Sequence, residues 1–293
     1  RQVLDLPEIR LQATEHQAEI KNCPACRKFT RAVFPVDVIR AVQYGKRIKA
    51  QMAYFHEYQL LPLGRTNETL YDLYDQDIAE GTILSACEEL AGTVQPVQEA
   101  VKDHLTHTAK VVRFDESGAR AIGKLHWFHV ASNEYLTYYA VHAKRGRVAM
   151  DAIGILPNLH GRAIHDDLPS YFRYGCKHGL CNDHHLRSLE FLLERYPQAW
   201  VKKLKDLLLE IQAAVEKAVS KAKTRLPVKT LDDFSTRYDA ILKQGFRQNP
   251  SPTSEIEYKR KRGRPKQSFA KNLLDRLRDH KESVLAFMYA FNV

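Results

Sequence analysis

Two segments of the chain share one design, in which a β-like apolar run ends in aspartate. The first segment runs from Val111 to Glu116, and the second from Arg162 to Asp167. Carboxylates at the ends of neighbouring strands can hold Mg²⁺, because oxygen ligands from one or two acids leave coordination positions open for phosphate and water. The repeated pattern therefore favours an enzyme that cuts and joins phosphodiester bonds. It also constrains the fold, since both strands must lie in one sheet.

The stretch from residue 110 to about 195 has an α/β pattern. The expected elements, in order, are strands at Val111–Phe114, Leu125–Val130 and Tyr135–Val141, a helix at Val148–Leu159 and a fourth strand around Ala163-Ile164. A hairpin turn is expected near Asn133-Glu134. Three antiparallel strands, a helix and a parallel strand make up most of a ribonuclease H-like core. In that fold the first acid lies on strand one and the second on strand four, which are the places of Asp115 and Asp166.

The residues on either side of this stretch are mainly helical. Apolar residues recur at helical spacing over Ile48–Leu61 and Leu70–Tyr74, and another helix is expected from Thr82 after a break at Glu80-Gly81. These helices resemble a helix-turn-helix unit, and ordinary helices packed on one another remain an equal alternative. Towards the C-terminus, residues 200–222 carry a continuous apolar stripe that predicts an amphipathic helix.

The composition favours a polyanionic partner. Lys and Arg outnumber Asp and Glu by 45 to 35, so the formal net charge is +10 and the pI is about 9.3. Basic residues that neutralise phosphates release condensed counterions, although an acidic membrane or a merely soluble surface gives the same charge signal. No apolar run approaches the roughly 20 residues that span a bilayer, and no signal peptide opens the chain. The sequence therefore predicts a cytoplasmic protein with no membrane partner.

The five cysteines favour metal binding over a disulfide framework. Cys23-Pro24-Ala25-Cys26 places two thiolates on one tight turn, and small strands are expected around it. A structural zinc site needs four ligands, and His16 is the only local substitute for the missing pair. Cys181, His184 and His185 form a second cluster, for which packing beside the acids is the alternative that the sequence favours over zinc.

Two further features suggest contact with DNA. Arg187 could bind a DNA phosphate or could pair with a nearby carboxylate. A basic run also follows a Pro/Ser/Thr-rich loop, and its cationic residues are Lys259, Arg260, Lys261, Arg262, Arg264 and Lys266. The run contains Arg-Gly-Arg-Pro, the core of an AT-hook that enters the minor groove of A·T-rich DNA. Plain phosphate contact or a solvated loop is the simpler interpretation of such a short run.

Many separate blocks of the sequence occur in the order of one known family. They are Arg1–Pro7, Glu15-His16, Cys23–Cys26, Val42–Gly45, Gln59–Pro62, Asp115-Glu116, His165-Asp166, Leu180–Asn182 with His184–Arg187, and Lys271–Leu277. Through these blocks the chain resembles the insertion sequence 66 family of transposases over essentially its whole length. The resemblance implies zinc-ribbon and helical DNA-binding modules joined to a ribonuclease H-like catalytic domain of the DDE type, with a helical insertion before the last acid.

The resemblance also implies a division of the chain and a set of roles. The expected domains are a partial zinc ribbon (1–40), a helical DNA-binding segment with helix-turn-helix as one alternative (41–108), the catalytic core (109–198), the helical insertion (199–258), and a basic loop with the start of the C-terminal catalytic helix region (259–293). Asp115 would be the first catalytic acid and Asp166 the second, both binding Mg²⁺ or Mn²⁺ for phosphoryl transfer. Zn²⁺ would bind Cys23 and Cys26 in a complete protein. The implied partners are transposon-end and target DNA, further copies of the chain and accessory proteins of the element, and the location is the bacterial cytoplasm, at the nucleoid when DNA is bound.

The third acid of the family leaves the activity of this chain open. The resemblance places that Glu after Val293, and the chain begins with Arg1, so we expect a piece of a longer protein. The main hypothesis is a transposase that cuts and joins element ends. The alternatives are a catalytically inactive remnant or regulator that binds these ends without cutting, and a nuclease or resolvase on the same fold that cuts without joining.

Overall fold

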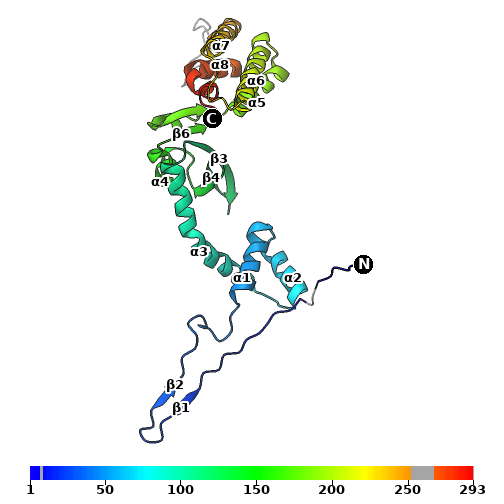
Figure 1. Cartoon of the computed structure of the whole chain (residues 1–293), viewed down its shortest axis with the longest axis vertical. Helices are drawn as coiled ribbons and strands as arrows, with labels where there is room; N and C mark the ends of the chain where they lie inside the picture. Colours follow the sequence, from blue (N-terminus) through cyan, green and yellow to red (C-terminus); the bar gives the residue numbers. More distant parts are fainter. Residues whose placement is uncertain (7–8, 252–266, 293) are drawn as a thin grey trace, which may run out of the picture. The chain divides into compact units, whose positions relative to one another are not determined.

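A computed structural model describes residues 1–6, 9–251 and 267–292. The chain forms two compact units, Arg1–Val97 and Gln98–Val293 (Figure 1). The boundary between the units falls within one long helix, α3 (Glu80–His107). The basic run at residues 259–266 lies outside the described residues. Among the residues that are described, no helix is both long and apolar enough to cross a membrane.

The first unit contains a small hairpin around the Cys-Pro-Ala-Cys turn. Strands β1 (Ile20–Asn22) and β2 (Phe29–Arg31) pair antiparallel. The Cys23 N–H donates to the Lys28 carbonyl at 3.0 Å, and the Arg27 N–H donates to the Cys23 carbonyl at 2.8 Å. The prediction of small strands around this turn is therefore confirmed.

Three helices make the core of the first unit. They are α1 (Lys46–Ala53), which continues as the π-helical turn η1 (Tyr54–Tyr58), α2 (Leu63–Tyr74), and the first part of α3. Met52, Leu70 and Ile83 are among the residues buried between them. The predicted break at Glu80-Gly81 is wrong, because both residues lie in the first turn of α3. Helix α2 instead ends at Tyr74, and the next residue, Asp75, has a left-handed φ of 53° that directs the chain out of the helix.

The second unit is built on a mixed five-stranded sheet in the order β5-β4-β3-β6-β7. Its strands are β3 (Val111–Ala121), β4 (Lys124–Ser132), β5 (Thr137–His142), β6 (Arg162–His165) and β7 (Lys177–Leu180). The pairs of β3 with β4 and of β4 with β5 are antiparallel, whereas β6 is parallel to both β3 and β7. The four predicted strands and the turn at Asn133 are confirmed. Strand β7 was not predicted, because its four residues begin with Lys-His and include glycine.

Strand β3 is much longer than its apolar run. It continues through the polar residues after Phe114, because nine of its residues, Arg113 to Ala121, pair with β4. Asp115 therefore lies within the strand, not at its end as predicted. Cross-strand backbone hydrogen bonds extend a strand regardless of whether its side chains alternate in hydropathy.

One face of the sheet is covered by the end of α3 and by α4 (Arg147–Ile153) with the 3₁₀ turn η2 (Leu156–Asn158). The buried cluster there includes Leu105, Val112, Met150, Ala163 and Tyr171. The sequence predicted one helix over Val148–Leu159, and the structure interrupts it at Gly154. Glycine adopts the φ of 80° found there without the steric cost that a side chain would add.

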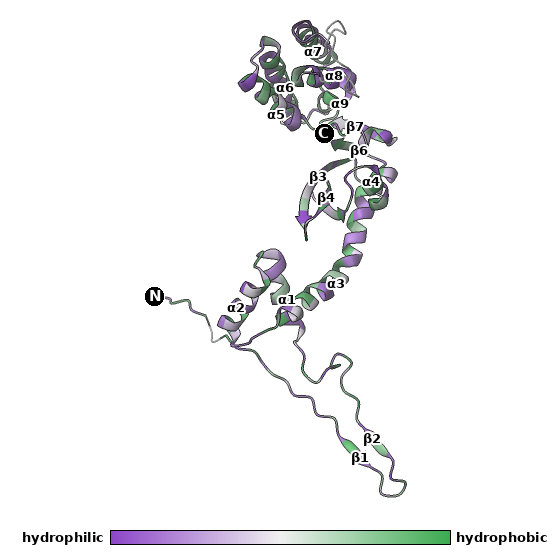
Figure 2. Cartoon of the chain, turned by 180° about the vertical axis from the view of Figure 1, so that it is seen from behind, coloured by the Kyte–Doolittle hydropathy of each residue, from purple (hydrophilic) through white to green (hydrophobic). Residues whose placement is uncertain are grey.

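A helical assembly packs at the β7 end of the sheet. Its helices are α5 (Asn182–Arg195), α6 (Ala199–Val219), α7 (Val228–Gln248), α8 (Phe269–Asp279), α9 (Lys281–Val284) and α10 (Ala286–Tyr289), and a 3₁₀ turn, η3 (Tyr171–Arg173), precedes β7. The predicted apolar stripe on α6 is confirmed. It is buried at Val201, Leu204, Leu208, Ile211 and Val215 and is exposed at the terminal Val219. Figure 2 shows both hydrophobic and hydrophilic residues on α6 and α7, as amphipathic helices require.

Candidate active site

The two predicted acids lie on neighbouring parallel strands. Residues of β3 and β6 pair in the register Val111↔Arg162 to Arg113↔Ile164. Continued by two residues, this register brings Asp115 opposite Asp166, which directly follows β6. The expected adjacency of the two strands is confirmed.

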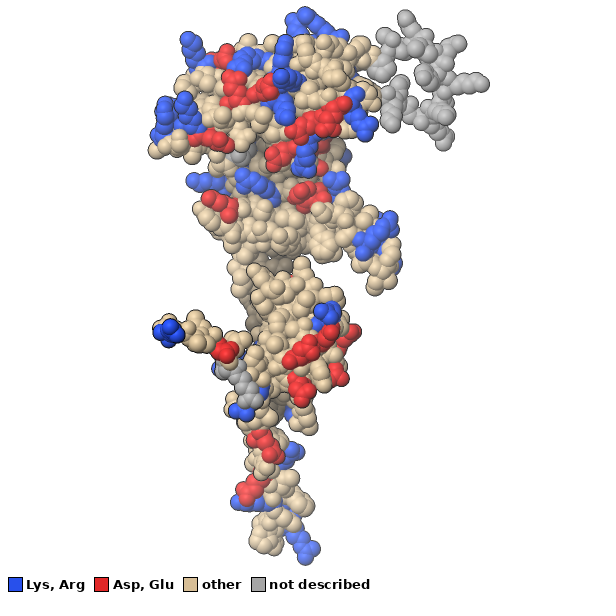
Figure 3. All heavy atoms as spheres, turned by 90° about the vertical axis from the view of Figure 1, so that its right-hand side faces the viewer, with Lys and Arg blue, Asp and Glu red and all other residues tan. Residues whose placement is uncertain are grey.

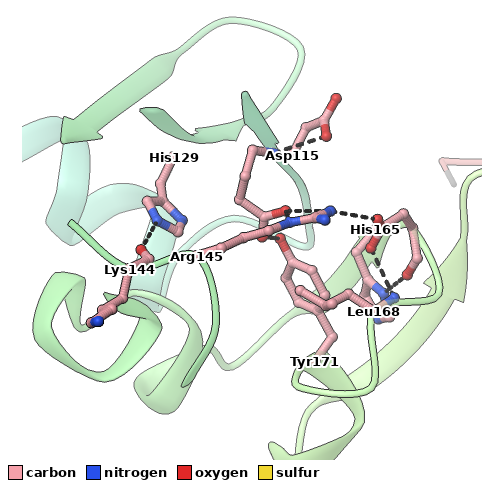
Figure 4. A network of polar contacts seen from close by, with 9 residues as sticks. Asp115, His129, Lys144, Arg145, His165, Leu168 and Tyr171 are labelled. Carbon is pink, nitrogen blue, oxygen red and sulfur yellow. Dashed lines mark hydrogen bonds and ion pairs between the residues drawn. The ribbon is translucent and has the colours of Figure 1, made fainter. Parts of the chain in front are cut away.

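The Asp115 carboxylate lies on the open face of β3. The residue is exposed, and its Oδ1 accepts the Glu116 N–H at 2.8 Å. In Figure 4 this carboxylate points away from Arg145. Successive residues of a strand point to opposite faces, so Asp115 shares its face with Arg113 and Glu116 lies on the other.

The Asp166 carboxylate is fixed by two donors. Its Oδ1 accepts the Leu168 N–H at 2.9 Å, and its Oδ2 accepts from Nη2 of Arg145 at 3.1 Å. The first contact is an Asx-type turn, in which an aspartate binds the backbone two residues later and sets the path of the chain after the strand. The carboxylate therefore has a defined orientation before any ligand binds.

Glu116 is the buried acid of the site. Its side chain is 1% exposed, accepts the hydroxyl proton of Tyr171, and lies 3.5 Å from both Nε and Nη2 of Arg145. Burial raises the pKa of Glu116, and the nearby Asp166 charge raises it further, whereas the contacts with Tyr171 and Arg145 lower it. One guanidinium thus bridges Glu116 and Asp166. No sequence pattern predicted a role for Glu116, Arg145 or Tyr171.

Arg145 comes from the loop between β5 and α4. Its guanidinium carbon lies 5.2 Å from the centre of the Trp127 ring, and its side chain is 37% exposed. Because the ring covers the guanidinium while both carboxylates contact it, Arg145 is held at one place between the two acids. Figure 4 shows it extending across the site towards the loop after His165.

A buried histidine supports the chain at Asp166. His165 stacks on Tyr171 with ring centres 4.3 Å apart, and its Nε2 lies 2.9 Å from Nδ1 of His178. Nδ1 of His165 contacts the Asp166 carbonyl, and Nε2 of His178 faces the Tyr174 carbonyl at 3.0 Å. A carbonyl oxygen only accepts, so each of these two nitrogens donates. Burial lowers the pKa of His165 to about 4, so the ring is neutral at pH 7.

In the second predicted cluster, at the start of α5, His185 is the buried residue. Nδ1 of the buried His185 lies 3.1 Å from the Asn182 side-chain oxygen, and Asn182 donates to the Val284 carbonyl at 3.1 Å. Burial lowers the pKa of His185 to about 3, and the Arg276 charge adds to this. These contacts fasten α5 to the segment that joins α9 and α10. They support the packing interpretation of this cluster over zinc.

The other predicted site residues lie apart from the acids. Arg187 is exposed on α5, and its Nε donates to the Asp183 carbonyl at 3.3 Å. Cys23 and Cys26 belong to the first unit, where hydrogen bonds from Cys26 and Ala25 lower the pKa of Cys23 and favour its thiolate. Asp167, which follows Asp166 directly and was not a predicted site residue, forms an ion pair with Arg276 on α8.

The donor set at β3 and β6 fits a hard divalent cation. Asp115 and Asp166 offer carboxylate oxygens, the ligands that Mg²⁺ and Mn²⁺ prefer. The described part of the chain holds no group of three or more His, Cys, Asp or Glu side chains placed to share a metal ion. In this conformation the positive partner of Asp166 is Arg145. Asp115 must therefore turn towards Asp166 for the two to bind one ion.

A cavity opens on the Asp115 side of the sheet. Its volume is about 550 Å³, and it is lined by residues of β3, β6, α5 and α6, among them Arg113, Ile164, Asn182 and Leu208. Arg113 lies two residues from Asp115 on the same face of β3. Asp115 and Asp166 do not line this cavity, which therefore lies beside the two acids, whereas Glu116 on the other face is buried.

The comparisons with known proteins place this architecture in an enzyme class. A family model described as "Transposase IS66 family" matches residues 41–293. By this match the protein falls in a class of transposases, the DDE transposases. More narrowly, the chain belongs to the IS66 family of transposases, which confirms the resemblance found in the sequence. A comparison with curated proteins gave no match.

Proposed function

We propose that the second unit carries the catalytic core of a DNA transposase and that this core has the ribonuclease H-like fold. The observation that carries the proposal is the parallel register of β3 and β6, which brings Asp115 opposite Asp166. The strand order β5-β4-β3-β6-β7, with three antiparallel strands followed by two parallel ones, also supports it. Residues 199–258 would then be the helical insertion of the family.

In this proposal each acid of the site has its own task. Asp115 and Asp166 would hold the divalent ion through their carboxylate oxygens. When bound, Mg²⁺ or Mn²⁺ supplies Lewis-acid activation of the attacking hydroxyl and of the leaving oxygen. Glu116, with Tyr171 and Arg145, orients Asp166 from the packed face. Asp115 is the residue that must reorient, since Asp166 is already fixed by Leu168 and Arg145.

The partner in this proposal is DNA, and the net charge of +10 supports it. The first unit and Arg187 would contact element-end DNA, and Zn²⁺ would bind at Cys23 and Cys26 once two further ligands complete the set. Further copies of the chain and accessory proteins of the element would complete the assembly in the bacterial cytoplasm, at the nucleoid.

One observation favours the alternative of a protein that binds DNA without cutting it. Arg145 already neutralises Asp166, and the Asp115 carboxylate points away from Arg145 (Figure 4). A chain fixed in this arrangement would hold a metal ion poorly and would act as a DNA-binding regulator. Cleavage separates the two functions, because only the transposase requires both carboxylates as ligands.

The test is metal-dependent nicking of a supercoiled plasmid that carries the cloned element ends. We expect nicking in Mg²⁺ or Mn²⁺, and a loss of about 100-fold or more in Asp115→Asn and in Asp166→Asn. Asp232→Asn, an exposed change of the same kind on α7, should retain nicking.

DNA binding without nicking would support the regulator. Nicking that survives both active-site substitutions would contradict the site assignment, and transfer of pre-cleaved ends to a target distinguishes a transposase from a nuclease.

A further inference from the structure

The β3–β4 hairpin extends beyond the rest of the sheet. Strand β6 pairs only with residues 111–113 of β3, and β5 pairs only with residues 127–132 of β4. From Ala119↔His126 to Ala121↔Lys124, β3 and β4 therefore pair only with each other. At about 3.4 Å per residue, this ribbon reaches roughly 10 Å past the sheet. Figures 1 and 2 show the tip of β3 and β4 projecting from the unit.

The projecting ribbon is positively charged. Between Ser117 and Asn133 the sequence contains Arg120 and Lys124 and no acidic residue. Both cations are exposed, and the Arg120 guanidinium reaches across the turn to the Gly123 carbonyl at 3.3 Å. Figure 3 shows Lys and Arg side chains on the lobe that projects at the level of these strands. The ribbon therefore presents a small cationic surface.

The residue at the tip is unfavourable for the folded chain alone. Ile122 is 102% exposed and has a φ of 50°, followed by Gly123 at 73°. A two-residue hairpin turn with both residues left-handed favours Asn-Gly, because a β-branched side chain is strained there. Full exposure means that packing inside the chain does not offset this strain. A strained residue at the end of a projecting element is typical of a contact site.

We propose that this hairpin is a DNA-contacting arm, in which Arg120 and Lys124 bind backbone phosphates and Ile122 inserts into the minor groove. Two-stranded ribbons contact DNA grooves, and apolar side chains at such tips unstack base steps and bend the duplex. The same strand carries Asp115 seven residues before Ile122, which is roughly 24 Å along the strand. The arm would therefore grip duplex DNA to one side of the phosphate that is cut. The choice of DNA as the ligand rests on the proposed function.

The first test measures duplex binding by the full chain. The probe is a fluorescently labelled A·T-rich duplex about four helical turns long, titrated over a series of salt concentrations. We expect Arg120→Ala/Lys124→Ala to weaken binding about tenfold and to lower the slope of log Kd against log salt by nearly 2, or about 0.9 per phosphate contact. The control, Lys221→Ala/Lys223→Ala, removes the same charge from an exposed turn after α6 and should leave the slope unchanged. An equal effect of both pairs would overturn the arm in favour of general charge attraction.

The second test uses the strain at the tip. Ile122→Asn creates the favoured Asn-Gly turn, so it should raise the melting temperature by about 2–4 °C while weakening duplex binding several-fold. Energy transfer between dyes at the two duplex ends should report less bending with this variant than with the unchanged chain. A residue with only a structural role could not improve folding and impair binding together. Binding and bending equal to those of the unchanged chain would refute the wedge.

The outcomes separate the arm from the proposed function. If the chain nicks DNA but the arm variants bind and bend it normally, only the arm fails. If the arm variants lose binding and no nicking occurs in Mg²⁺ or Mn²⁺, only catalysis fails. Absence of duplex binding by the unchanged chain would refute both.

Discussion

Glu116 and Asp166 depend on a single cation, the Arg145 guanidinium. Removal of one partner from a buried ion pair is costly, because it leaves the other charge without compensation in a region of low dielectric constant. Burial raises the pKa of Glu116, and the contact with Arg145 opposes this rise, so the Glu116 charge depends on Arg145. Arg145 therefore acts as a positioning residue, and its effect should appear both in stability and in the orientation of Asp166.

A double-mutant cycle tests this dependence. We expect Arg145→Gln to lower the free energy of unfolding by about 1–3 kcal/mol at pH 7, and to lower it less when Glu116→Gln is also present. Urea unfolding of the four proteins gives the coupling energy. Arg147→Gln is the control, because its pair with Asp151 at 3.3 Å is exposed and should cost under about 0.5 kcal/mol. Equal effects of the two arginine substitutions would contradict the shared role of Arg145.

The buried histidines predict a dependence of stability on pH. Unfolded histidine has a pKa near 6.5, whereas burial lowers the pKa of His165 to about 4 and of His185 to about 3. As the pH falls below 6.5, protons bind the unfolded chain first, so stability is lost by up to about 1.4 kcal/mol per pH unit for each ring. The contribution of each neutral ring to stability is therefore present in full above about pH 7.

His185→Asn isolates the contribution of one ring. The substitution keeps a donor near the position of Nδ1 that faces Asn182 but removes the titrating group. Urea unfolding between pH 7.5 and pH 4.5 should therefore show a shallower loss of stability in the variant than in the unchanged chain. Parallel pH profiles would mean that His185 titrates normally in the folded protein.

The two aspartates could be predicted because each follows a short apolar run that is typical of a strand. The residues that support them could not be predicted. Tyr171 and Glu116 meet across 55 positions of sequence, and Arg145 lies 29 positions from Glu116, so their contact depends on how the sheet and loops pack. Only the alternation within β3 could have indicated that Glu116 faces the interior.

At the scale of elements, the parallel pairing of β3 with β6 depends on a close backbone approach at Gly161. A Cβ at this position would lie 2.4 Å from the Ala109 carbonyl oxygen and 2.8 Å from that of Lys110. These are backbone atoms just before β3, and the Arg162 N–H donates to the Lys110 carbonyl at 2.9 Å. A side chain at residue 161 would therefore push apart the two strands that carry the aspartates.

Gly161→Ala should be strongly destabilising for this reason. We expect it to lower the free energy of unfolding by about 2 kcal/mol or more, because rigid backbone cannot move aside as a side chain can. Gly175→Ala is the matched control, since no atom lies within 4 Å of its added Cβ. Denaturant unfolding followed by circular dichroism compares the two. A change of equal size in both variants would show that loss of glycine flexibility, not the close approach, sets the cost.

Element boundaries were predicted less well than element types. The strands and the long helix α6 follow from their apolar patterns, which depend on neighbours in sequence. The length of β3 and the existence of β7 depend on pairing with distant strands, which local hydropathy does not record. Likewise, the end of α4 at Gly154 follows from one backbone angle within a continuous apolar pattern.

For the whole molecule, the α/β class and the mixed sheet followed from the order of the strand and helix patterns. The transposase family followed from blocks spread over the entire chain. The arrangement of α5 to α10 could not be derived in the same way, because amphipathic helices of similar length can pack in several orders. Net charge is the whole-molecule property that follows most directly from the sequence, and it leads to a prediction about DNA binding.

The basic run at residues 259–266 contributes six cationic side chains to a net charge of +10. Replacement of all six by Ser should weaken DNA binding by the full chain and lower the slope of log Kd against log salt by about 0.9 for each phosphate that the run neutralises. Competition between A·T-rich and G·C-rich duplexes then distinguishes the two interpretations of the run. An AT-hook reads the narrow minor groove, so its removal should abolish a preference for A·T-rich DNA. If the run makes only phosphate contacts, its replacement should weaken binding to both duplexes equally. An unchanged salt slope would show that the run is a solvated loop.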